Sequence, residues 1–255
     1  MKRILKTAGC FMAVWLLSAC SSHYVLTGIE RSRFVIDNRY DQSADPQATA
    51  ILDKYKLKVD SIMSPVIGTA AHDMKVVRPE SDLSNLLSDI LVWAGKAYDE
   101  KPVLGIYNMG GIRAALNKGE VTYGDVLAIA PFENKIAFTT LTGRQLLTLF
   151  SQIAAKGGEG VSRGTELVIS SKGELLSARL HGNDIDPQAE YRVATVDYLV
   201  QGNDGLKVFK EGSRTISPQE EINNTRFIIM DYFKEKTAKG ETVSSQVEGR
   251  IKIKD

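Results

Sequence analysis

Apolar residues recur every three or four positions in several stretches of this chain, which is the spacing of one face of an α-helix. The strongest case is residues 81–98, where Leu83, Leu87 and Ile90 fall on one face. The same spacing predicts further helices over residues 48–63, 123–129, 142–155 and 218–235. We therefore expect several amphipathic helices, each turning one face towards a core.

Short apolar or alternating runs between these helices predict β-strands. We expect strands at residues 65–71, 103–107, 135–141 and 192–196, and a last one within 246–254. Residues 166–170 and 175–180 are expected to form a hairpin, because a Ser-Lys-Gly turn separates them. Helices and strands in this mixed order predict an α+β fold (mixed α/β layers).

A polar stretch precedes the first predicted helix. Residues 20–45 are expected to form a tether, in which residues 24–26 and 34–36 could be short strands. The remaining residues 46–255 are long enough to bury one core as a single domain. A content of 43% hydrophobic and 25% charged residues is ordinary for a globular protein.

The first 19 residues have the three zones of a secretory signal peptide. Lys2, Arg3 and Lys6 give a positive start, and residues 11–17 are nearly all apolar. Leu-Ser-Ala-Cys then ends at Cys20 and resembles a bacterial lipobox, in which that cysteine is lipidated. The alternative is a plain signal peptide followed by a coincidental cysteine. We expect residues 1–19 to be the leader and the mature protein to be lipid-anchored in the bacterial cell envelope. Ser21 after the cysteine favours the outer membrane, with the protein facing the periplasm.

Charge and cysteine content narrow the partners of the mature chain. The net charge is +1, and losing the three positive residues of the leader brings it to −2. A near-neutral chain gives no reason to expect a nucleic-acid partner. Cys10 leaves with the leader and Cys20 carries lipid, so neither a disulfide nor a thiolate metal site is expected.

Several catalytic patterns are missing from the sequence. The chain has three histidines, His23, His72 and His181, and no Asp-x-His or Gly-Asn-His motif of the kind that two-metal hydrolases use. It also has no Gly-x-Ser-x-Gly elbow and no phosphate-binding P-loop.

Residues 108–114 are the first candidate site. They read Asn-Met-Gly-Gly-Ile-Arg-Ala and follow a predicted buried strand, a common position for ligand-binding loops. Two glycines allow the backbone to approach a ligand closely, and Arg113 offers a planar fork to a phosphate or carboxylate. The alternative is a glycine-rich turn with a surface arginine.

Two further stretches carry aromatic residues near polar ones. Phe132 and Asn134 lie on a loop after Pro131, and Tyr198 and Asp204 follow the strand at residues 192–196. Loop aromatics can stack on a flat base, while an amide and a carboxylate can bond base edges and sugar hydroxyls. The alternative is that both rings simply pack into the core.

Taken in order, these stretches resemble the signature of the 5'-nucleotidase C-terminal domain. That family carries Asn-x-Gly-Gly-Ile-Arg, Pro-Phe-x-Asn, Ala-Thr-x-Asp-Tyr/Phe and a Gly-x-Asp-Gly loop. Residues 78–86 and 141–147 resemble two more of its segments. The resemblance covers roughly residues 60–236, with Ser84 and Asn203 in places where the family usually has glycine.

The resemblance implies a nucleoside held between two aromatics. Carried over by position, the implied substrate-binding residues are Phe132, Tyr198, Asn134, Asp204, Arg113, Arg78, Gly158 and Gly160. The aromatics would clamp the base, Asn134 and Asp204 would read base and ribose, and the arginines would hold the anionic end. The glycines would line the base edge.

In that family a metallophosphatase domain with two metal ions precedes this one, and residues 1–60 are too short to encode it. We therefore expect no catalytic residue, metal or other cofactor in this chain, which should bind without cleaving. Our first hypothesis is the nucleoside- or nucleotide-binding part of a 5'-nucleotidase for nucleotide catabolism, completed by a separate metallophosphatase chain that holds divalent metals. The alternatives are a stand-alone nucleoside- or nucleotide-binding lipoprotein and, third, a scaffold that has lost its ligand.

Overall fold

The structure is a computed structural model that describes residues 26–40 and 45–255. The expected leader and Cys20 lie outside the described residues. The chain divides into two units, one up to Leu52 and the other Asp53–Asp255. In the first unit, residues 34–36 are irregular, so the short strand considered there is wrong, and residues 24–25 of the other one lie outside the described residues.

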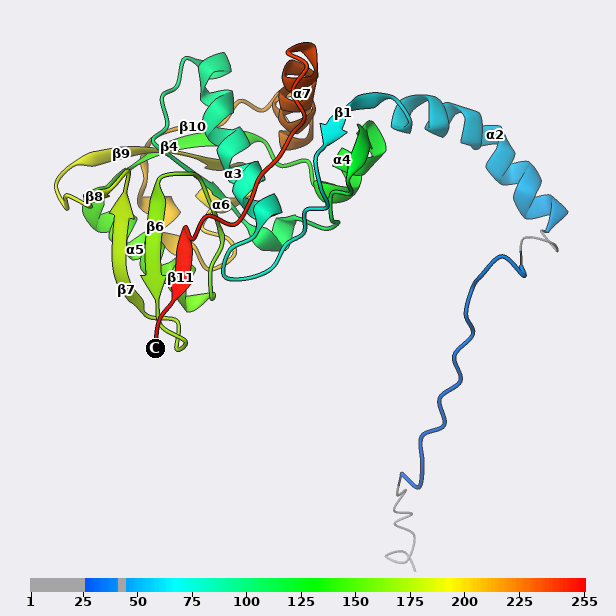
Figure 1. The fold of residues 1–255 in the computed structure, drawn as a ribbon, viewed down its shortest axis with the longest axis horizontal. Helices are drawn as coiled ribbons and strands as arrows, with labels where there is room; N and C mark the ends of the chain where they lie inside the picture. Colours follow the sequence, from blue (N-terminus) through cyan, green and yellow to red (C-terminus); the bar gives the residue numbers. More distant parts are fainter. Residues whose placement is uncertain (1–25, 41–44) are drawn as a thin grey trace, which may run out of the picture. The chain divides into compact units, whose positions relative to one another are not determined.

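Helix α2 (Pro46–Met63) confirms the first predicted helix (Figure 1). Asp45 precedes it, and its Oδ1 accepts a 2.7 Å hydrogen bond from the backbone N–H of Gln47. This contact satisfies one of the backbone donors that a helix start leaves without an intrahelical partner. Within the described chain, no side chain of α2 is buried.

A five-stranded sheet organises the second unit, in the order β10-β4-β9-β2-β5. β4 (Ile136–Thr142) and β9 (Glu190–Val196) pair antiparallel over their whole length, and β2 (Leu104–Tyr107) runs parallel to β9. β5 (Gly160–Val161) and β10 (Ser213–Ile216) form the two edges. All four residues of β2 are buried, which explains its uninterrupted apolar sequence.

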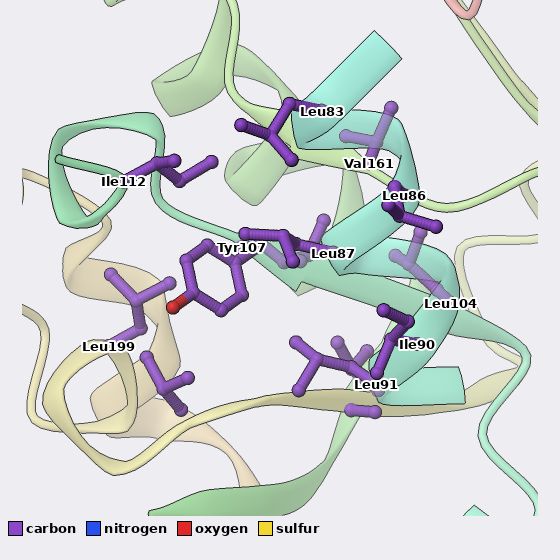
Figure 2. Close-up of a cluster of buried hydrophobic side chains, with 14 of the residues drawn as sticks. Leu83, Leu86, Leu87, Ile90, Leu91, Leu104, Tyr107, Ile112, Val161 and Leu199 are labelled. Atoms are coloured by element: carbon purple, nitrogen blue, oxygen red, sulfur yellow. The ribbon is translucent and has the colours of Figure 1, made fainter. Parts of the chain in front are cut away.

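Two amphipathic helices pack on strands of this sheet. α3 (Asp82–Ala94) is capped by Ser81, and α5 (Gly143–Ala155) begins with a reciprocal capping box between Thr142 and Gln145. Figure 2 shows how the apolar face of α3 packs on β2. The labelled side chains there include Leu87, Ile90 and Leu91 from the helix, with Leu104 and Tyr107 from the strand. All of these side chains are buried.

Two smaller sheets complete the fold (Figure 1). One joins β1 (Val66–Ala70) and β3 (Gly119–Thr122). The other has the order β11-β6-β7-β8 and contains the predicted hairpin. Its strands are β6 (Thr165–Ile169), β7 (Leu175–Leu180), β8 (Asn183–Asp184) and β11 (Ile251–Ile253). The mixed α/β fold class is therefore confirmed.

Two helix assignments need correction. α7 (Thr225–Ala238) starts seven residues later than the sequence pattern suggested, because a short 3₁₀ turn at Glu221–Asn223 precedes it. Tyr198 lies in the short helix α6 (Asp197–Val200) instead of a loop. The short helix α4 (Tyr123–Ile129) has the predicted bounds. No helix within residues 26–40 and 45–255 combines the length and apolar character needed to cross a bilayer.

Candidate ligand-binding site

Strand directions bring the three candidate stretches together beyond the C-terminal ends of β2 and β9. β2 and β9 are parallel, so the residues that follow them emerge on the same side. β4 runs antiparallel to β9 with Ile136 opposite Val196, so the residues that precede β4 also lie there. Asn108 after β2, Asn134 before β4 and Asp197 after β9 therefore lie at the same end of the strands.

A pocket of about 270 Å³ lies where the three segments meet. Five of the eight residues implied by the family resemblance line it. The full lining is Asn108, Gly110, Gly111, Arg113, Phe132, Asn134, Tyr198 and Asp204.

The first wall is the turn after β2, which forms the 3₁₀ helix η3 (Met109–Gly111). Asn108 is 3% exposed, and its Nδ2 donates a 2.7 Å hydrogen bond to Oδ2 of Asp204 on the opposite wall. A side chain at position 111 would bring its Cβ within 2.9 Å of Oδ1 of Asn108. Glycine at 111 thus leaves room for the buried amide that joins the two walls.

Two aromatic side chains face the pocket from separate segments. Phe132 is 45% exposed and Tyr198 is 37% exposed, whereas the phenylalanines of the core are fully buried. The guanidinium carbon of Arg113 lies 5.7 Å from the centroid of the Phe132 ring, within cation–π range. Its Nη1 also donates to the carbonyl oxygen of Gly110 at 3.3 Å. Arg113 is therefore held at the rim next to one aromatic.

Asp204 occupies the second wall in the left-handed backbone region, with φ of +53°. One carboxylate oxygen accepts from Asn108, and the other accepts from the phenol of Tyr198 at 3.1 Å. The bond to this carboxylate raises the pKa of Tyr198 above its ordinary value, with smaller contributions from desolvation and from charge repulsion. Each oxygen keeps acceptor capacity for a ligand hydroxyl.

The other three implied residues lie outside the pocket lining. Arg78 directs its Nη2 to Oε1 of Glu159 at 2.9 Å. A Cβ on Gly158 would come within 2.2 Å of the carbonyl oxygen of Pro79, and one on Gly160 within 2.7 Å of the Ser88 hydroxyl. Close packing accounts for both glycines.

Asn108, Gly110 and Gly111 also line the pocket, although the family resemblance implied no role for them. The sequence predicted a close backbone approach at the two glycines and an anion contact at Arg113, but it gave Asn108 no role. The signal was available, because a turn that presents Arg113 at a strand end places its other residues against the same space. Within residues 26–40 and 45–255, no group of three or more His, Cys, Asp or Glu side chains is arranged to hold a metal ion.

Comparison with known proteins agrees with this fold and its motifs. The family model described as "5'-nucleotidase, C-terminal domain" matches residues 66–211. The 5'-nucleotidase precursor of Thermus thermophilus superposes with a TM-score of 0.70 at 28% identity, over 81% of this chain and 43% of that one. The protein is thus a mixed α/β domain with a ligand-sized pocket at the ends of its central strands. The chain belongs to the 5'-nucleotidase C-terminal domain family.

Curated relatives are much longer than this chain. The trifunctional nucleotide phosphoesterase protein YfkN of Bacillus subtilis is 30% identical over 229 residues, which are 82% of this chain and 15% of the relative. The silent protein UshA(0) of Salmonella typhimurium is 28% identical over 134 residues, 51% of this chain and 23% of the relative. The cell wall protein Lmo0130 of Listeria monocytogenes is 23% identical over 238 residues, 82% and 30% respectively. The chain spans less than a third of each of these three proteins.

Proposed function

We propose that this chain is the nucleoside- or nucleotide-binding part of a 5'-nucleotidase-type phosphohydrolase. The observation that carries the proposal is the pocket itself, which sets two exposed aromatics beside a carboxylate, an amide and an arginine. Membership of the family and likeness to nucleotide-processing relatives support the same ligand class.

Each part of the pocket suits one part of a nucleotide. The rings of Phe132 and Tyr198 would stack on the base, and Asn134 would supply both a donor and an acceptor to its edge. Asp204, an acceptor held in place from both sides, would take the ribose hydroxyls. Arg113 at the rim would meet the anionic end.

Hydrolysis would be completed by a separate metallophosphatase chain. Cleavage of a phosphate ester by that class uses metal-activated water at a two-metal centre, and this chain would contribute the orientation of the base and ribose. Lipidation of Cys20 would hold the protein in the cell envelope, and Ser21 at the next position favours the outer membrane.

The second candidate is a nucleoside- or nucleotide-binding lipoprotein that works alone. The observation behind it is that residues 108–204 bring two aromatics, an amide, a carboxylate and an arginine to one pocket. Phosphate release separates the two proposals. The chain alone should release no phosphate from AMP, and release should begin when a metallophosphatase encoded beside it is added. Binding without any gain from such a partner would favour the second candidate.

Calorimetric titration of the full-length chain with adenosine and with AMP tests the ligand class. The variant with Phe132→Ala and Tyr198→Ala should lose most of the affinity, because each base–aromatic stack contributes about 1–3 kcal/mol. Tyr55→Ala is the control, since Tyr55 is an exposed aromatic on α2. Equal affinity in the double variant and the wild type would refute the aromatic clamp.

A further inference from the structure

Glu159 places a carboxylate in the interior next to the pocket. The residue is 1% exposed and lies between Gly158 and Gly160, where the chain enters β5. A buried carboxylate is strongly unfavourable unless charged groups and hydrogen-bond donors surround it. The partners of Glu159 therefore indicate what the residue does.

One oxygen of Glu159 holds the first wall of the pocket. Oε2 accepts a 2.6 Å hydrogen bond from the backbone N–H of Met109. Met109 starts η3, and it lies between two lining residues, Asn108 and Gly110. The first N–H groups of a helical turn have no partner inside the turn, so this bond satisfies a donor that would otherwise be left open.

The other oxygen holds two cations. Oε1 lies 2.9 Å from Nη2 of Arg78 and 3.1 Å from Nζ of Lys156. The side chain of Arg78 is 37% exposed and that of Lys156 is 27% exposed, so both reach inward from near the surface. Two positive charges thus lie against one carboxylate, and their attraction offsets part of the cost of burying it.

Lys156 extends the network to the second wall. Its Nζ also donates a 2.6 Å hydrogen bond to the backbone carbonyl oxygen of Asp204. Asp204 has a positive φ, a conformation that a non-glycine residue keeps only when its surroundings hold it there. Through Lys156, Glu159 is therefore connected to the residue whose carboxylate faces the ligand space.

We propose that Glu159 is the positioning residue of this pocket: it fixes the Met109 turn directly and the Asp204 turn through Lys156. The inference rests on the proposed function for its ligand and names a residue to which the family resemblance gave no role. It also explains why Arg78 lies outside the pocket lining, because its guanidinium pairs with Glu159. Among the residues that the structure describes, Arg113 is the one cation in the pocket lining.

The variant Glu159→Gln tests the inference, because an amide has one acceptor oxygen and would direct an NH₂ group at one set of donors. Glu80→Gln is a matched control. Glu80 is also buried, and it accepts from Nδ2 of Asn85 at 2.7 Å and from the N–H groups of Glu248 and Ile251 at 2.8 and 3.3 Å. It ties the C-terminal segment to α3 and does not line the pocket.

Both variants should lower the midpoint of thermal unfolding, but only one should change binding. Measured by calorimetry well below that midpoint, Glu159→Gln should weaken adenosine binding about tenfold or more, as expected for loss of charge-assisted hydrogen bonds. Glu80→Gln should stay within about twofold of the wild type, because stability alone does not alter the affinity of folded protein. Lys156→Met changes a residue nearer the surface and should also weaken adenosine binding. If Glu159→Gln does not fold, the affinity of Lys156→Met tests whether the network positions the pocket.

A second readout needs no ligand. In a ¹⁵N–¹H NMR spectrum, the amide resonances of Met109 and Asp204 should move in Glu159→Gln and stay in place in Glu80→Gln. The inference is overturned if these resonances are unchanged, or if adenosine affinity survives Glu159→Gln. If the wild type binds neither adenosine nor AMP, the proposed function fails, while the two resonances still decide whether Glu159 positions the walls.

Discussion

The phenol of Tyr198 donates a hydrogen bond to Oδ1 of Asp204, with 3.1 Å between the two oxygens. The two residues are six positions apart, and the turn that joins them is closed by a second bond, from Nδ2 of Asn203 to the carbonyl oxygen of Tyr198 at 2.8 Å. The ring that would stack on a base and the carboxylate that would bind ribose are thus held by each other.

This bond predicts an altered titration of Tyr198. Asp204→Asn should lower the pKa of Tyr198 towards its ordinary value, because the hydrogen bond to the carboxylate and the repulsion of a phenolate both disappear. An NMR titration of the tyrosine ring carbons measures the change. Asp184→Asn, at an exposed aspartate of β8, is the control and should leave this pKa unaltered.

The same bond has a defined effect on stability. Because the folded-state pKa of Tyr198 is raised, its stabilisation is complete below the unfolded pKa of about 10 and is lost as pH rises through the folded value. The difference in unfolding free energy between wild type and Asp204→Asn should therefore shrink above about pH 10. A difference that grew in this range would contradict the bond.

Arg113 should distinguish nucleotides from nucleosides. In Arg113→Met, AMP affinity should fall about tenfold, the worth of a charge-assisted hydrogen bond, whereas adenosine affinity should stay within about twofold. Calorimetry with both ligands measures the ratio. Arg144→Met, at an exposed arginine of α5, should change neither. Equal losses for both ligands would mean that Arg113 acts by supporting the Phe132 ring that it contacts.

Gly157 is a matched control for testing why position 158 needs glycine, because both residues have a positive φ. Gly158 has φ of +111° and backbone of Pro79 against its Cβ position, whereas Gly157 has φ of +75° and open space. Gly158→Ala should lower the unfolding free energy by about 3 kcal/mol or more, from strain and overlap together. Gly157→Ala should lower it by about 1–2 kcal/mol, the penalty of a left-handed conformation alone. Urea unfolding measures both, and similar values would rule out the contact with Pro79.

The sequence predicted the ligand-facing side chains of the pocket better than the helix boundaries and the buried residues that hold them. Arg113, Phe132 and Tyr198 lie next to strands whose apolar runs are readable locally, so their shared position follows from strand order once the sheet is known. The late start of α7 was not readable. Ile222 continues the apolar spacing of the helix, but Asn223 beside it is buried and accepts a 2.9 Å hydrogen bond from the phenol of Tyr98, 125 positions away.

Glu159 and Lys156 escaped for the same reason. In sequence they are ordinary charged residues beside glycines, a pattern typical of a solvated turn. Their partners Arg78, Met109 and Asp204 are 48 to 81 positions away. Contacts of this range come from the packing of whole elements, which local spacing does not reveal. The residues that would touch a ligand carry a local signal, and those that hold them do not.

Arg192 and Glu100 test how firmly the sheet beneath the pocket is held. Arg192 on β9 forms a two-pronged pair with Glu100, with nitrogen–oxygen distances of 2.7 and 2.6 Å, and the two side chains are 17% and 15% exposed. Glu100→Gln should lower the unfolding free energy by about 2 kcal/mol, because it leaves a largely buried guanidinium without its counter-charge. Asp184→Asn removes the partner of Arg179 in a pair whose side chains are 56% and 84% exposed, and should change it by less than about 0.5 kcal/mol. Adenosine affinity should be unchanged in both variants, since neither ion pair lines the pocket. A loss of affinity in Glu100→Gln would show that the pocket depends on the register of β9 as well as on its own loops.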